Sequence, residues 1–157
     1  MATSDESSTP AEHRVIHEAA HAVVARRVGL NLAYVGKTVV NVLMTSSDSI
    51  RKRAAYYSGG VLAEEILLGD VHPEHGERDR EVVQGMRERS PDEAAQGEID
   101  ARAIISACRD AVEALAEWLR GPVRPQIDKV LELIDERCPE PKSGDPEEAS
   151  GGATVGE

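Results

Sequence analysis

Two histidines and a glutamate stand at a spacing that suits metal-assisted hydrolysis. His17, Glu18 and His21 form the pattern His-Glu-x-x-His. In a helix, residues i and i+4 lie one above the other, so the two imidazoles face the same way. They can bind a single Zn²⁺, and the Glu18 carboxylate then lies close by as a general base for water. Zinc with a neighbouring carboxylate is the minimum equipment for splitting an amide with water.

The flanking residues predict that this pattern lies on one helix over residues 10–28. Thr9 and Pro10 have the types of an N-cap and a first helical residue, Glu12 completes a capping box, and Gly29 suits the left-handed backbone after the last turn. Apolar residues cover most of the circumference, which is typical of a buried helix. Buried histidines must be paired or bound to something. Without a metal, the segment is interpreted as a core helix with ordinary histidine hydrogen bonds.

The rest of the chain is predicted to be mostly helical with a small β element. β-Forming residues between 31 and 44 predict one or two short strands, either a substrate-binding edge or a structural hairpin. Further helices are expected at 49–68, 77–87, 90–119 and 122–137. Gly59 and Gly60 fall inside a helix, where each costs roughly 1 kcal/mol relative to Ala. We expect them to allow close approach of the helix that carries His17 and His21.

Charge and composition restrict the partners and the compartment. The 157 residues carry a net charge of −11 and no basic stripe, so neither nucleic acid nor an anionic membrane is an expected partner. No membrane span or signal peptide is recognisable, and we expect a cytoplasmic protein. Cys108 and Cys138 are far apart in sequence and are expected to be reduced thiols. Polar, acidic tails at 1–9 and 139–157 are predicted to be disordered around one domain at 10–138.

The third ligand of the predicted zinc site is not fixed by the His-Glu-x-x-His pattern. Catalytic zinc usually takes three protein ligands and keeps a fourth position open. The metzincin continuation, with a glycine and a third histidine, is missing from residues 22–34. Glu64 or Glu65 could supply the ligand from the second helix, and His72 or His75 could supply it from the loop that follows.

Three segments together resemble the peptidase domain of FtsH-type zinc proteases: HEAAHAVVARRVG, YYSGGVLAEEILLGD and HGERDREVV. Members of that family carry a His-Glu-x-x-His helix, a helix with a Gly-Gly-x-x-Ala-Glu-Glu pattern, and a loop leading to an aspartate ligand. The resemblance implies a mostly α (α+β), helical zincin-like peptidase domain. It further implies that His17, His21 and Asp79 bind Zn²⁺ and that Glu18 is the general base. His13 is interpreted as a residue at the lip of the site.

The function implied by this resemblance is that of a zinc metallopeptidase acting on peptide or protein substrates. FtsH-type proteases unfold their substrates with an ATPase module and are held in a membrane. The 157 residues show neither part: Gly36-Lys37-Thr38 lacks the first P-loop glycine, because Asn31 occupies that position. We expect ATP-independent cleavage of unfolded or accessible segments, or segments presented by a separate ATPase or partner protein. The alternative is a catalytically inactive module of the same fold that acts as an adaptor or regulator.

Overall fold

The computed structural model describes residues 9–139, which are mostly helical with one antiparallel two-stranded sheet. Apart from Thr9 and Pro139, the two expected tails lie outside the described residues. None of the described helices is long and apolar enough to span a membrane. The elements in chain order are α1 (Pro10–Val28), β1 (Asn31–Val35), β2 (Val40–Leu43), α2 (Ile50–Ala63) with a π-helical continuation η2 (Glu64–Leu68), α3 (Glu77–Arg89), α4 (Pro91–Ala107), α5 (Arg109–Arg120) and α6 (Ile127–Arg137).

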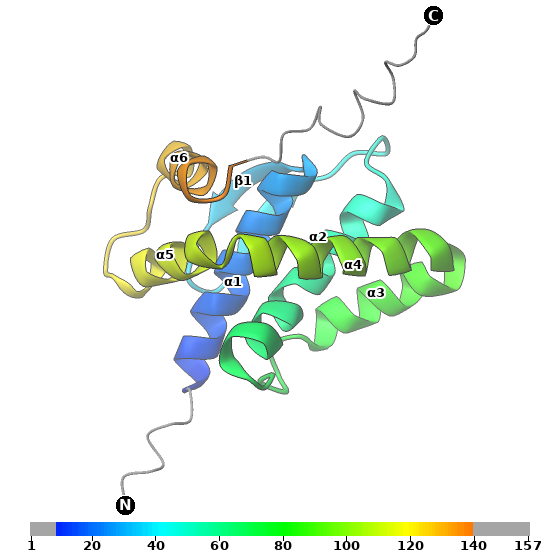
Figure 1. The fold of residues 1–157 in the computed structure, drawn as a ribbon, viewed down its shortest axis with the longest axis horizontal. Helices are drawn as coiled ribbons and strands as arrows, with labels where there is room; N and C mark the ends of the chain where they lie inside the picture. The colour runs from blue at the N-terminus through cyan, green and yellow to red at the C-terminus, as the bar shows by residue number, and fades with distance from the viewer. Residues whose placement is uncertain (1–8, 140–157) are drawn as a thin grey trace, which may run out of the picture.

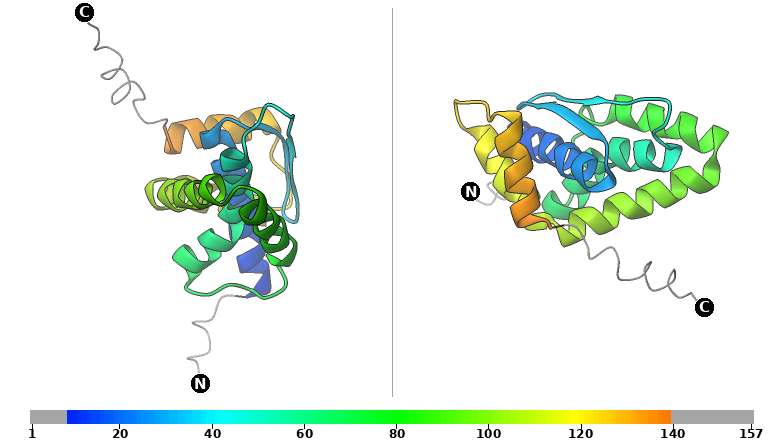
Figure 2. Two further views of the ribbon diagram at one scale, coloured as in Figure 1. Left: turned by 90° about the vertical axis from the view of Figure 1, so that its right-hand side faces the viewer. Right: turned by 90° about the horizontal axis from the view of Figure 1, so that it is seen from above.

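Helix α1 runs through the middle of the domain, with the strands on one side and α4 on the other (Figure 1 and Figure 2). Its predicted ends are confirmed: Thr9 Oγ1 accepts the Glu12 N–H at 3.1 Å, and Gly29 has a φ of 88°. The Glu12 carboxylate does not complete the capping box, because it accepts a hydrogen bond from Arg120 Nε at 3.0 Å. The buried residues of α1 are His13 and all residues from Val15 to Ala25. As expected of a helix apolar all round, α1 is a core element.

The predicted β element is a hairpin in which β1 and β2 pair antiparallel, with an irregularity between Leu32 and Tyr34. Strand β1 packs on α1 and α6. The turn between the strands is fastened to α1, because Arg14 Nη2 donates to the Thr38 carbonyl at 2.7 Å. The hairpin is therefore held as a wall beside the helix of the two histidines.

Helix α2 lies close against α1, as its two glycines predict. A Cβ at Gly59 would lie 3.1 Å from Val24 Cγ2, and a Cβ at Gly60 would lie 2.6 Å from the Cδ2 atom of His17. Only residues without a side chain let the two helices approach this closely. The helix continues through η2 to Gly69, whose φ of 90° ends it, so the predicted bounds of 49–68 are confirmed.

The prediction of a single helix at 90–119 is wrong, because the chain turns at Cys108 and forms two helices, α4 and α5. Helix α4 packs mainly on α2, whereas α5 packs on α1, and one straight helix cannot follow both. The expectation of reduced thiols is also wrong for this structure. Helix α6 returns to the turn, where Cys108 and Cys138 form a disulfide with Cα atoms 5.0 Å apart.

The last helix begins at Ile127, later than the expected start at Pro122. Pro125 disfavours helical backbone at the residue before it, so residues 121–126 form a connection. Arg124 in this connection lies over the Tyr34 ring, 4.7 Å from its centroid. The connection thereby brings α6 alongside β1.

Candidate metal centre

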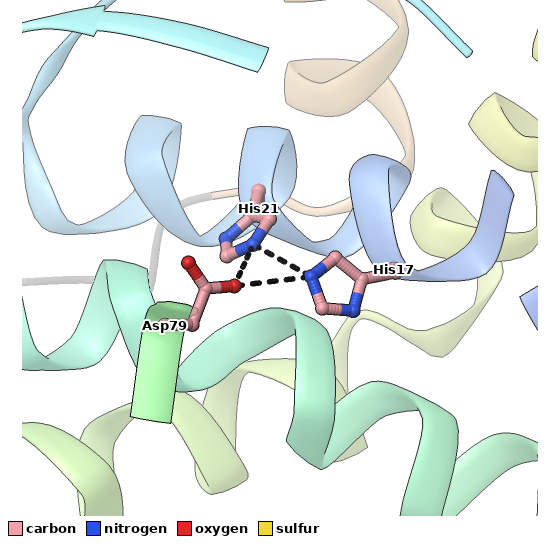
Figure 3. A group of neighbouring side chains, drawn as sticks. All are labelled: His17, His21 and Asp79. Carbon is pink, nitrogen blue, oxygen red and sulfur yellow. Dashed lines mark hydrogen bonds and ion pairs between the residues drawn. The ribbon is translucent and has the colours of Figure 1, made fainter. Parts of the chain in front are cut away.

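Helix α1 and the first turn of α3 bring His17, His21 and Asp79 together (Figure 3). The Nε2 atoms of the two histidines are 3.1 Å apart, and Asp79 Oδ2 lies 3.1 Å from His17 Nε2 and 3.0 Å from His21 Nε2. Both histidines are buried, and Asp79 is largely buried. Residues four apart on one helix and a carboxylate distant in sequence thus meet at one point.

Each histidine is oriented by a hydrogen bond through its other ring nitrogen. His21 Nδ1 lies 2.8 Å from the Tyr56 carbonyl oxygen, and His17 Nδ1 lies 2.6 Å from Glu64 Oε2. A carbonyl and an ionised carboxylate can only accept, so both Nδ1 atoms carry hydrogen. The Nε2 atoms of the neutral rings therefore present lone pairs to each other and to Asp79. This arrangement brings three acceptor atoms together around a place for a cation.

The electrostatics of the centre also favour a positive charge between these atoms. Burial lowers the pKa of His17, but hydrogen bonds with Asp79 and Glu64 outweigh it and raise this pKa to about 9. Burial raises the pKa of Asp79, but its bonds with His17 and His21 outweigh it and hold the pKa below its usual value. A proton on His17 is one way to supply the charge, and a metal ion is another.

The donor set fits Zn²⁺. Imidazole nitrogens and one carboxylate oxygen are ligands that catalytic zinc sites use, and tetrahedral zinc places its ligand atoms about 3.3 Å apart. The observed separations of 3.0–3.1 Å are close to this value. Among the described residues, His17, His21 and Asp79 are the one group of histidine, cysteine and acidic side chains whose ligand atoms converge in this way.

Glu18 lies beside this group in a cleft of about 390 Å³. Its side chain is buried, and this burial raises its pKa. The positive charges of His21, His17 and Arg14 lower the pKa but do not outweigh the burial. The Arg14 Nε atom lies 3.3 Å from Glu18 Oε2. The cleft is lined by Arg14, His17, Glu18, His21, residues 38–42, Met44, Tyr56, Tyr57, His75, Arg78 and Asp79. A carboxylate with a raised pKa that faces such a cleft is suited to proton transfer.

The other candidate ligands do not reach the three acceptor atoms. Glu64 is fully buried and faces Nδ1 of His17, the nitrogen on the far side of the ring from Asp79. Glu65 is exposed. His72 and His75 lie in the loop before α3 with their rings stacked, 4.2 Å between centroids. His75 lines the cleft without joining the ligand group.

The structure corrects the interpretation of His13 and shows a role for Glu64 that sequence reasoning missed. His13 is not at the lip: it is 3% exposed, and its Nδ1 lies 2.8 Å from Glu64 Oε1. The sequence suggests Glu64 only as a possible metal ligand, yet its carboxylate binds His13, His17 and the backbone N–H of His72. The available signal was an acidic residue in a largely apolar helix, which requires a buried partner.

No family model, curated protein or solved structure matches this chain. What the centre can do is therefore inferred from its own atoms.

Proposed function

We propose that this protein is a zinc-dependent peptidase of the FtsH-like, zincin-like type. One observation carries the proposal: His17 Nε2, His21 Nε2 and Asp79 Oδ2 lie within 3.1 Å of one another. Hydrogen bonds at Nδ1 hold both rings in this orientation. When both rings are neutral these three atoms are all acceptors, so a cation between them is favoured, and the ligand types are those of a catalytic zinc site.

The neighbouring residues support hydrolysis rather than a purely structural metal. Zinc held by His17, His21 and Asp79 would polarise a carbonyl group and make water more acidic. Glu18 would take a proton from the attacking water and pass it to the leaving amine nitrogen as the carbon–nitrogen bond breaks. The products are a carboxylic acid and an amine. The raised pKa of Glu18 favours both steps, because it brings proton uptake nearer to neutral pH.

The shape of the cleft supports an extended polypeptide as substrate. Residues 38–42, which include most of β2, form one side of the cleft, and β2 pairs within the described residues with β1 alone. An open strand edge can bind an extended chain through backbone hydrogen bonds. Only unfolded or accessible segments present a backbone in this way, so these are the proposed substrates, presented with or without a separate ATPase or partner protein.

The test is the metal content of protein purified without a histidine tag, measured by mass spectrometry for wild type and Asp79→Ala. We expect near one zinc per chain in the wild type and much less in the variant. Cleavage of an unstructured peptide library should then depend on zinc and stop with a chelator. Zinc retained by Asp79→Ala would contradict the ligand set. A wild type that binds no added zinc would contradict the proposed function.

A further inference from the structure

Behind the metal centre, a second layer of polar groups meets at Glu64. Its Oε2 atom faces His17 Nδ1 at 2.6 Å. Its Oε1 atom lies 2.8 Å from His13 Nδ1 and accepts the His72 backbone N–H at 2.8 Å. Glu64 is fully buried, and its pKa is lowered because hydrogen bonds with His17, His72 and His13 outweigh the effect of burial. All of these partners come from α1 or from the loop that leads to Asp79.

His13 occupies the place from which the Glu64 carboxylate can be oriented. It lies one turn before His17 on α1, on the same face. Its ring is 3% exposed and is held at its other side, where Nε2 lies 3.4 Å from Asp70 Oδ1. Because Glu64 Oε1 is bound on one side by His13 and on another by the loop backbone, the carboxylate cannot rotate freely. The position of Oε2, and with it the plane of the His17 ring, is thereby fixed.

We propose that His13 is a positioning residue of the metal centre, acting on His17 through Glu64. Carboxylates that hold the second nitrogen of a ligand histidine set its ring orientation and its basicity. Here the carboxylate itself is held by another histidine from the same helix. The inference rests on the proposed function only in taking the ion to be zinc. The positioning role differs from a purely structural role, in which His13 would only pair with the buried Glu64 carboxylate and stabilise the fold.

The experiment compares zinc affinity among variants at residue 13, measured by competition with a chromophoric chelator. His13→Leu removes the donor to Glu64. His13→Asn keeps a donor to Glu64, because the amide nitrogen of Asn is separated from the backbone by the same number of bonds as Nδ1 of His. His72→Asn is the matched control: the His72 side chain has no bond to Glu64, whereas its backbone N–H remains. Cobalt absorption spectra and the unfolding of metal-free protein are recorded in parallel.

We expect His13→Leu to bind zinc roughly 10-fold to 100-fold more weakly and to change the cobalt spectrum. His13→Asn should recover most of the affinity, and His72→Asn should match the wild type. If His13→Leu fails to fold, His13→Gln is compared with His13→Asn, since its amide lies one bond too far to replace Nδ1. Equal zinc affinity and an unchanged spectrum in the folded residue-13 variants would overturn the proposal.

A result in which His13→Leu and His72→Asn weaken zinc equally would also overturn it, because the effect would then be a general loss of stability. The failure of the proposed function is distinguishable from these results. If the wild type binds no zinc, both the function and the role of His13 are lost, whereas unchanged binding by His13→Leu refutes the role of His13 alone.

Discussion

Gly60 on α2 lies directly against the His17 ring on α1. A Cβ at residue 60 would overlap Nε2 of His17 and lie 2.6 Å from both Cδ2 and Cε1. The ring cannot move aside easily, because Glu64 holds its Nδ1 atom and His21 lies 3.1 Å from its Nε2 atom. The glycine thus forms part of the candidate metal centre, although it offers no ligand atom.

Gly60→Ala should therefore weaken zinc binding by about 10-fold or more, although alanine favours a helix by about 1 kcal/mol. The physical reason is that the ring of His17 must be displaced to make room for the methyl group. Zinc titration by calorimetry measures the effect. Gly85→Ala is the control, because a Cβ at this position in α3 meets no atom within 4 Å. It should keep zinc affinity and gain about 0.5–1 kcal/mol of stability. Equal zinc affinity in both variants would contradict the contact described here.

Glu18→Gln should retain zinc and lose turnover. The amide keeps the size of the side chain but cannot accept a proton as a general base, and such groups typically contribute about 10²-fold to 10⁴-fold in rate. Zinc content and peptide cleavage are measured on the same preparation. A variant that cleaves as fast as the wild type would exclude Glu18 as the base. Wild-type protein that binds zinc and cleaves nothing would instead favour the catalytically inactive module.

The metal-free protein should become less stable as the pH rises. His17 has a reference pKa of 6.5, and in the fold its pKa is raised to about 9. Folding therefore favours the protonated ring, and this contribution is complete below pH 6.5 and is lost as the pH rises through about 9. Urea unfolding of chelator-treated protein across this range measures it. His17→Gln should make the free energy of unfolding less dependent on pH over this range. Zinc-saturated protein should not lose stability in the same way, because zinc requires the deprotonated ring. Metal-free protein whose stability rises over this range would contradict the assignment.

Reduction of the disulfide between Cys108 and Cys138 should lower the free energy of unfolding. The bond closes a loop with a sequence separation of 30, and a loop of this length stabilises a fold by about 2–4 kcal/mol through the unfolded state. Urea unfolding with and without a reductant measures the difference. Cys138→Ser provides the control, since reductant should not change its stability further. Zinc affinity should be unaffected, because neither cysteine lines the cleft of the metal centre.

Local signals in the sequence were sufficient to predict much of the fold and half of the centre. The i, i+4 spacing places His17 and His21 on one face of any helix, and Thr9 and Gly29 end that helix through hydrogen bonds and backbone angles within a few residues. The pair Gly59-Gly60 likewise predicted a close helix contact, because two glycines inside a helix need an offsetting reason. These features depend on neighbours along the chain, and the sequence specifies such neighbours directly.

The residue pattern alone left open which side chain meets the two Nε2 atoms. Only the resemblance to FtsH-type proteases implied Asp79, and the tertiary structure brings Asp79 Oδ2 to both nitrogens. Both Glu64 and Asp79 follow the histidines at long range, and the path of residues 69–76 turns Asp79 toward Nε2 while Glu64 remains behind His17. The burial of His13, the break between α4 and α5 at Cys108, and the bond from Cys108 to Cys138 were also absent from the sequence-based expectations. Each depends on how distant helices pack, and a pattern of residue types along one helix does not determine which distant residue will lie against it.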